Sequence, residues 1–140
     1  MSDLNGKVAL VTGASAGLGA ATAKLFAERG ATVFGIARDG SRMAEVFAEI
    51  PGGSFASVDI ASPQACAQAV TDCVAQFGRL DVLANIAGFH RMRHTASMTD
   101  ADWDADLAVN LNGPFYLSRA ALPHLLEKGG NIVNVSSIAG

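Results

Sequence analysis

The sequence predicts an α/β fold, a Rossmann-like doubly wound parallel sheet with the strand order 3-2-1-4-5. Short and almost wholly apolar runs recur along the chain, as is typical of strands that helices cover on both faces. These runs alternate with longer segments of helical period, which indicates parallel strands joined by helices. Right-handed crossovers then favour the order 3-2-1-4-5. The 140 residues fit a single domain, 1–140.

The first half of the chain predicts three strand–helix units. The expected strands are residues 7–12, 32–37 and, less regularly, 54–59; the expected helices are 17–29, 42–49 and 63–77. In the first helix, Leu18, Ala21, Leu25 and Phe26 recur on one face, which predicts that this face packs on the sheet. Ser41 and Ser62 are the expected N-caps of the second and third helices, and Pro63 suits a first helical position.

The second half predicts two further strands around a long helix. The strands are residues 80–85 and 131–136, and residues 88–98 form a loop without a clear period. A mostly helical stretch runs from the cap Thr99 to about Glu127 and is bent near Gly113 and Pro114. The loop is expected to border the substrate entrance.

Composition and charge exclude several function classes. A net charge of −3 gives no electrostatic case for binding nucleic acid or an anionic membrane, and no apolar run approaches the length of a membrane span. The N-terminus has no signal-peptide pattern, and Cys66 and Cys73, too far apart on one helix to pair, are expected to be reduced thiols. Both features indicate a cytoplasmic protein. His90 and His94 stand four residues apart but have no third ligand nearby, so no metal site is expected.

A glycine-rich turn follows the first predicted strand. Gly13, Gly17 and Gly19 lie where that strand gives way to a helix, at the point where the order of strands reverses and α/β proteins bind ligands. Glycine allows close approach of the backbone, and the free N–H groups at the start of a helix attract anions. Ser15 adds a hydroxyl donor. The turn therefore predicts a phosphate or diphosphate site, although a merely tight turn would use the same residues.

Five motifs, in order, resemble those of the short-chain dehydrogenases/reductases. They are TGASAGLG at 12–19, VDI at 58–60, NIAG at 85–88, VNLNGPF at 109–115 and NIVNVSS at 131–137. The resemblance covers essentially the whole chain and implies an NAD(P)(H)-dependent oxidoreductase that interconverts a secondary alcohol and a ketone. It implies cofactor contacts from Gly13, Ser15, Gly17, Leu18 and Gly19 in the first motif.

The same resemblance assigns the adenine and ribose contacts. Asp59 would accept the adenine amino group and the Ile60 amide would meet the ring, although Asp59 could simply be a solvated carboxylate. Asn85, Ala87 and Gly88 would form the wall beside the ribose. The family motif usually has a second Asn where this chain has Ile86.

Cofactor choice depends on the end of the second strand. An acid there accepts the ribose 2′-OH, whereas a base favours a 2′-phosphate. Ala37 takes the place of the acid and Arg38 follows it, which favours NADP(H). Ala16, where many NADP-preferring relatives carry a base, and the nearby Asp39 oppose that preference, so NAD(H) stays possible.

Two residues carry the chemistry that the resemblance implies. Asn110 matches an asparagine that holds a proton-relaying water, and Ser137 matches the serine that hydrogen-bonds the substrate carbonyl. Each also has a purely structural interpretation, as a satisfied helix asparagine and as a serine bonded within its own turn.

The family's proton donor, a tyrosine in the pattern Y-x-x-x-K beyond the serine, does not occur in these 140 residues. The single tyrosine, Tyr116, precedes the serine and is followed four residues later by Ala120. The chain by itself is therefore expected to be a poor catalyst, and a fragment of a reductase, a split gene product and a non-catalytic nucleotide-binding module all fit. Its fifth strand would form an exposed apolar edge. For the full-length form the resemblance implies a homo-oligomer, a dimer or tetramer, acting on a small carbonyl or alcohol.

Overall fold

One parallel sheet organises the computed structural model, which describes residues 3–138. Its strands are β1 (Val8–Thr12), β2 (Thr32–Ala37), β3 (Ser54–Ser57), β4 (Val82–Asn85) and β5 (Asn131–Asn134). They pair in the order β3-β2-β1-β4-β5, and each pair is parallel. The predicted fold class and strand order are confirmed. The order reverses between β1 and β4, which places the switch point at the end of β1.

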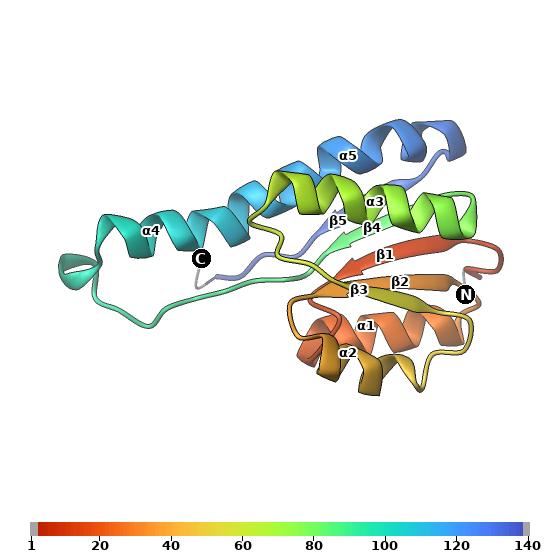
Figure 1. Cartoon of the computed structure of the whole chain (residues 1–140), viewed down its shortest axis with the longest axis horizontal. Coiled ribbons are helices and arrows are strands. Elements are labelled where there is room, and N and C mark those ends of the chain that lie inside the picture. The colour runs from red at the N-terminus through yellow and green to blue at the C-terminus, as the bar shows by residue number, and fades with distance from the viewer. Residues whose placement is uncertain (1–2, 139–140) are drawn as a thin grey trace.

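Helices cover both faces of the sheet (Figure 1). Helices α1 (Gly17–Glu28) and α2 (Gly40–Phe47) lie on one face, and α3 (Pro63–Phe77) and α5 (Gly113–Lys128) lie on the other. Helix α4 (Asp100–Leu107) continues the line of α5 beyond the strands, and a short 3-10 turn, η1 (Thr95–Ser97), precedes it. This arrangement leaves the carboxyl ends of β1, β2 and β4 open to one side.

Alternate residues of the strands pack into two hydrophobic cores, one on each face of the sheet. Leu10 and Leu83 pack with Leu117 and Val70 under α3 and α5. Val11, on the opposite face of β1, packs among residues that include Met43 of α2. Cys66 and Cys73 are buried free thiols, and burial raises their pKa values to about 11 and about 12. Within residues 3–138, no helix is both long and apolar enough to cross a membrane.

The prediction of which face of the first helix packs on the sheet is wrong. Leu18, Ala21 and Leu25 are exposed, whereas Gly19 and Ala23 are the fully buried residues of α1. Small residues face inward because α1 begins directly against the turn that follows β1, where larger side chains do not fit.

Two of the three predicted N-caps are confirmed. The Ser62 hydroxyl accepts a hydrogen bond from the Ala65 N–H, and Thr99 and Asp102 form a reciprocal capping box. The prediction of Ser41 as a cap is wrong, because α2 begins at Gly40 and its cap is Asp39. The Asp39 carboxylate accepts the Arg42 N–H at 3.0 Å, so the helix starts one residue before Ser41, which lies within its first turn.

The long helix is interrupted as predicted, one turn before the expected bend. Residues Ala108–Asn112 form a turn of π-helix, η2, between α4 and α5. Pro114 has no N–H to donate to the carbonyl of Asn110, so the regular hydrogen-bond ladder cannot pass this point.

Strand β5 lies at the edge of the described sheet. Val133 and Val135 are 48% and 45% exposed, so the predicted apolar edge is confirmed. The third strand is shorter than predicted, ending at Ser57 instead of Asp59, and Val58 to Ile60 turn toward the end of the sheet.

A buried carboxylate ties the start of β1 to the strand beside it. Asp81, 3% exposed, accepts the Val8 N–H at 2.9 Å and two hydrogen bonds from Arg79 at 2.8 and 2.6 Å. Burial raises the pKa of Asp81, but the bonds from Arg79 and Val8 and the charge of Lys7 outweigh burial and hold the pKa below its ordinary value.

Asp81→Ala is expected to lower the free energy of unfolding at pH 7 by about 2–3 kcal/mol, because the Val8 N–H loses its acceptor. Since the folded-state pKa is depressed, the contribution of Asp81 is complete above the ordinary carboxyl pKa and is lost as the pH falls below it. Urea unfolding at pH 7 and at about pH 3 measures both effects. Glu49→Ala, which removes an exposed ion pair with Lys24, is the control. A difference between wild type and Asp81→Ala that does not shrink at low pH would contradict this account.

Candidate cofactor-binding site

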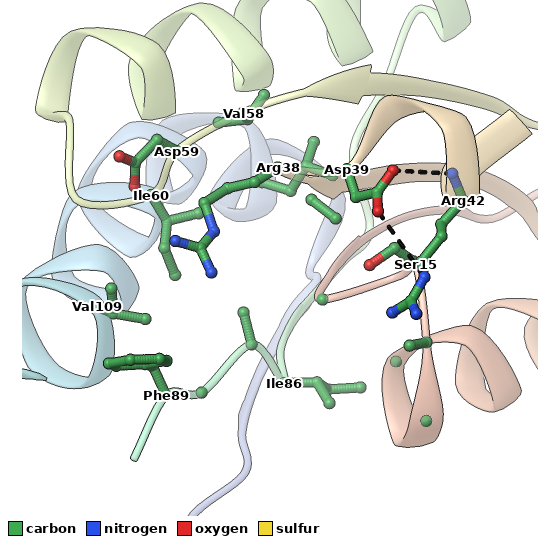
Figure 2. Close-up of a pocket in the computed structure, with 18 of the residues that line it drawn as sticks. Ser15, Arg38, Asp39, Arg42, Val58, Asp59, Ile60, Ile86, Phe89 and Val109 are labelled. Atoms are coloured by element: carbon green, nitrogen blue, oxygen red, sulfur yellow. Dashed lines mark hydrogen bonds and ion pairs between the residues drawn. The ribbon is translucent and has the colours of Figure 1, made fainter. Parts of the chain in front are cut away.

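A pocket of about 520 Å³ lies at the carboxyl ends of the strands, at the switch point (Figure 2). It is lined by the segments that follow β1, β2, β3 and β4, together with Arg42 of α2 and Val109 of η2. Of the cofactor-binding residues predicted from the sequence, all but Asn85 line it: Gly13, Ser15, Gly17, Leu18, Gly19, Arg38, Asp59, Ile60, Ala87 and Gly88. Segments far apart in the chain therefore meet at one cavity.

The turn after β1 is shaped by two glycines. Gly13 has a φ of +67°, and a Cβ there would lie 3.0 Å from the Ala87 Cα. A Cβ on Gly19 would lie 2.1 Å from the Gly13 carbonyl oxygen. Helix α1 can therefore start close to the turn, and its N-cap, Ala16, has no side chain that accepts a first-turn N–H. These backbone donors face the pocket with the positive end of the helix dipole behind them.

Thr12 is a structural residue of the site that the sequence reasoning missed. Its buried hydroxyl oxygen accepts hydrogen bonds from the N–H groups of Ile86 and Ala87, each at 2.8 Å. Thr12 thereby joins the end of β1 to the segment after β4 and holds two walls of the pocket together. The sequence feature that could have indicated this role is a threonine at the end of an otherwise apolar strand.

Asn85 lies behind the pocket wall instead of in it. Its side-chain amide donates to the Oδ1 of Asn134 at 2.8 Å and to the Ser118 hydroxyl at 3.4 Å, so it bridges β4, β5 and α5. The next residue, Ile86, lines the pocket where the family motif has its second asparagine. Ile86 contributes an apolar surface there, and its backbone N–H is already bonded to Thr12.

Asn110 fixes the segment after β4 from the other side. Its Oδ1 accepts the Phe89 N–H at 2.9 Å, and its amide donates to the Phe89 carbonyl oxygen. This pairing holds Phe89 against the pocket, where its ring lies beside Val109 (Figure 2). Ser137 is exposed beyond the end of β5 and does not line the pocket, and neither does Asn110.

Charged side chains line the pocket after the β2 and β3 ends. Figure 2 shows the Arg38 guanidinium directed into the middle of the pocket beside Ile60. The Ser57 hydroxyl donates to the Arg38 carbonyl oxygen at 2.7 Å and so fixes the backbone from which this side chain projects. One carboxylate oxygen of Asp59 accepts the Ala61 N–H at 3.0 Å, which leaves the other to accept from a ligand.

Ion pairs hold the loop that follows β4 against helix α4. Buried Asp102 binds Arg91 at 2.7 Å and Arg93 at 2.9 Å, and the Arg91 guanidinium lies 5.2 Å from the centre of the Phe89 ring. Hydrogen bonds from Thr99 hold the pKa of Asp102 below its ordinary value against the effect of burial, helped by the charges of Arg93 and Arg91. Between residues 3 and 138, no three His, Cys, Asp or Glu side chains are grouped to hold a metal ion.

A doubly wound parallel sheet whose switch point opens into a glycine-lined pocket defines a Rossmann-type α/β protein. Comparison with known families narrows the class, because the family model described as short chain dehydrogenase matches residues 7–140. The chain belongs to the short-chain dehydrogenase family, as the sequence motifs predicted.

Individual relatives agree with this assignment. The D-threitol dehydrogenase of Mycolicibacterium smegmatis is 40% identical over 97% of this chain and 54% of its own length. The 3-oxoacyl-acyl-carrier-protein reductase FabG of Thermotoga maritima is 39% identical over 98% of this chain and 58% of its own length. The chain thus spans about half the length of the curated relatives it matches.

Solved structures share the fold closely. A metagenomic short-chain oxidoreductase in complex with NADP has a TM-score of 0.92 and 40% identity, over 98% of this chain and 65% of that one. A short-chain alcohol dehydrogenase structure from Sinorhizobium meliloti also has a TM-score of 0.92, with 36% identity over 97% of this chain and 56% of that one.

Proposed function

We propose that the pocket binds a nicotinamide dinucleotide, with NADP(H) favoured over NAD(H). The observation that carries this proposal is the glycine turn at the switch point, where uncapped N–H groups at the start of α1 face the pocket beside Ser15. A Cβ on Gly19 would collide with the backbone carbonyl of Gly13, so glycine at this position lets α1 begin close against the turn that lines the pocket. A diphosphate matches such a corner in charge and in hydrogen-bonding capacity.

The other residues of the pocket suit the rest of a dinucleotide. Asp59, with one free carboxylate oxygen, is proposed to accept the adenine amino group, and Ile60 to contact the ring. Ala87 and Gly88 are proposed to lie against a ribose, since a methyl group on Ala87 and no side chain on Gly88 leave room beside the backbone. Asn85 supports this wall from behind through Asn134.

Arg38 supports the preference for NADP(H). Its side chain points into the pocket directly after β2, the position from which α/β proteins discriminate the ribose 2′ substituent. Guanidinium can bind a 2′-phosphate at two points, whereas the neutral Ala37 offers no acceptor for a 2′-OH.

For the whole protein, we propose the reversible oxidation of a secondary alcohol to a ketone. The bound nicotinamide supplies the site that gives or accepts hydride. From this chain, Ser137 is proposed to hydrogen-bond the substrate carbonyl and Asn110 to keep the segment around Phe89 in place while serving the proton relay. Y-x-x-x-K does not occur in the sequence, so these 140 residues alone are proposed to turn over poorly.

A non-catalytic nucleotide-binding module is the second candidate, because the family's Y-x-x-x-K pattern does not occur in these 140 residues. Whether the encoding gene continues past residue 140 into Y-x-x-x-K separates the two candidates. Such a segment, together with reduction of small ketones by the longer protein, would support the reductase, whereas a gene without it whose product binds NADPH without turnover would support the module.

The full-length protein is proposed to act on a small molecule as a cytoplasmic homo-oligomer. Exposed apolar side chains along the consecutive helical segments α4, η2 and α5 support association between copies of the protein: Trp103, Leu111, Phe115, Leu122 and Leu126. The unpaired buried thiols of Cys66 and Cys73 support a reducing compartment.

Arg38→Ala is expected to weaken NADPH binding by about 10- to 100-fold and to change NADH binding by less than about threefold, because only the 2′-phosphate loses a charged partner. Fluorescence titration of the purified chain with each nucleotide measures both constants. Arg29→Ala, at the far end of α1, is the matched control. An equal loss for both nucleotides would contradict the assigned preference, and no binding of either by wild type would contradict the proposed function.

A further inference from the structure

The structure gives Asp39 a role other than contact with a ribose 2′-OH. From its position after Arg38, a carboxylate could read the ribose 2′-OH and repel a 2′-phosphate. Instead, Asp39 caps α2 and pairs with Arg42, a residue that the sequence analysis did not assign. We propose that Arg42 is a second determinant of NADP(H) specificity and that Asp39 is its positioning residue. This inference rests on the proposed function of the pocket.

Both carboxylate oxygens of Asp39 are engaged by the same residue. Oδ1 accepts the backbone N–H of Arg42 at 3.0 Å, and Oδ2 lies 3.8 Å from the Nε of the Arg42 guanidinium. Figure 2 shows the carboxylate turned toward α2. Asp39 thus satisfies the first turn of the helix and pairs with a cation at the same time, while it also lines the pocket.

The guanidinium of Arg42 is left with its terminal groups available. A guanidinium has five N–H donors, and contact at Nε leaves the two Nη groups to meet another acceptor. Arg42 lines the pocket, and Figure 2 shows its side chain descending from α2 toward Ser15. Arg38 enters the same pocket from the β2 end, nearer Ile60. The two arginines therefore approach the pocket from two sides.

Two guanidinium groups line the pocket and can meet a group more negative than a ribose hydroxyl. Arg38 and Arg42 stand against two carboxylates, Asp39 and Asp59, so the pocket has no net formal charge and each arginine contributes through direct contact with the ligand. The Arg42 side chain is 66% exposed, so solvent and salt screen its effect. We therefore expect a moderate contribution from Arg42, smaller than that of Arg38.

The test compares Arg42→Ala, Arg42→Lys and Asp39→Asn with wild type by fluorescence titration with NADPH and with NADH. Arg42→Ala is expected to weaken NADPH binding by about 5- to 10-fold and to leave NADH binding within about twofold. Arg42→Lys is expected to recover part of that loss, since it restores the charge without the two-point donor. The loss on Arg42→Ala should shrink when the salt concentration is raised from about 0.05 to 0.5 M.

Asp39→Asn separates the two roles that a carboxylate could have here. Asparagine still caps a helix, so the variant keeps α2 and removes only the charge. If Asp39 acts as proposed, NADH binding stays within about twofold of wild type; if it reads the ribose 2′-OH, NADH binding weakens markedly.

Lys24→Ala removes an exposed cation paired with Glu49 outside the pocket and is the matched control. Thermal melts confirm that each variant is folded. The inference is overturned if Arg42→Ala leaves the ratio of NADPH to NADH affinity unchanged, if Lys24→Ala lowers it equally, or if Asp39→Asn selectively loses NADH. A wild-type chain that binds neither nucleotide overturns the proposed function instead.

Discussion

Gly19→Ala is expected to abolish detectable nucleotide binding and to lower the free energy of unfolding by about 3 kcal/mol. The added Cβ would lie 2.1 Å from the carbonyl oxygen of Gly13 and 2.9 Å from that of Thr12. Both are backbone atoms at the end of the central strand, so no side-chain rotation relieves the contact. Helix α1 must move away from the turn, and the N–H groups that face the pocket move with it.

The matched control is Gly88→Ala, on the opposite wall of the same pocket. Its Cβ would meet the Asn110 Oδ1 at 3.5 Å, an ordinary contact, so its stability is expected to stay within about 0.5 kcal/mol of wild type. Urea unfolding of both variants measures the difference in stability, and NADPH titration of Gly19→Ala against wild type measures the loss of binding. Gly19→Ala with wild-type affinity for NADPH would refute the arrangement described for the turn.

Thr12→Val is expected to destabilise the chain by about 2–4 kcal/mol and to weaken nucleotide binding at least tenfold. Valine has nearly the same shape, but it removes the acceptor of the Ile86 and Ala87 N–H groups. Those two donors lose their acceptor in a partly buried position, so the β4 segment is expected to separate from the end of β1 and widen the pocket.

Thr12→Ser is the control, because it keeps the hydroxyl oxygen and loses only a methyl group. Its cost is expected to be near 1 kcal/mol, with little change in affinity. Hydrogen exchange of the Ile86 and Ala87 amides reports the broken bonds directly. Equal protection of these amides in Thr12→Val and wild type would contradict the role given to Thr12.

The sheet was predictable from the sequence because its central strands are buried on both faces. The β1 segment is fully buried, and its short apolar run, followed by a segment of helical period, is typical of a strand covered on both faces. The length of β3 was overpredicted because this strand lies at an edge of the sheet, where alternating burial gives Ser54–Ser57 a weaker apolar pattern. The buried face of α1 was wrong because hydrophobic periodicity selects large side chains, whereas close packing against the turn selects Gly19 and Ala23.

The pocket was predictable because each of its walls follows a strand, and the carboxyl ends of parallel strands meet at one edge. The sequence could not show which partners the polar side chains around the pocket bind. Asn85 bridges two strands, and Thr12 binds the backbone of another segment. These partners are set by tertiary contacts, for Thr12 across more than 70 residues of chain, that leave no local pattern. The Asp39 cap is a local contact with Arg42, and Ser41 nearby was an equally plausible cap from the sequence.

The central claim is that backbone amides at the start of α1 bind the diphosphate of a nicotinamide dinucleotide. Titration of the ¹⁵N-labelled chain with NADPH, followed by amide chemical shifts, tests it most directly. We predict saturable shifts that are largest at Gly17, Leu18 and Gly19, with a second group at Ile60. Saturable shifts that leave those three amides unmoved, or no shifts at any NADPH concentration, would contradict it.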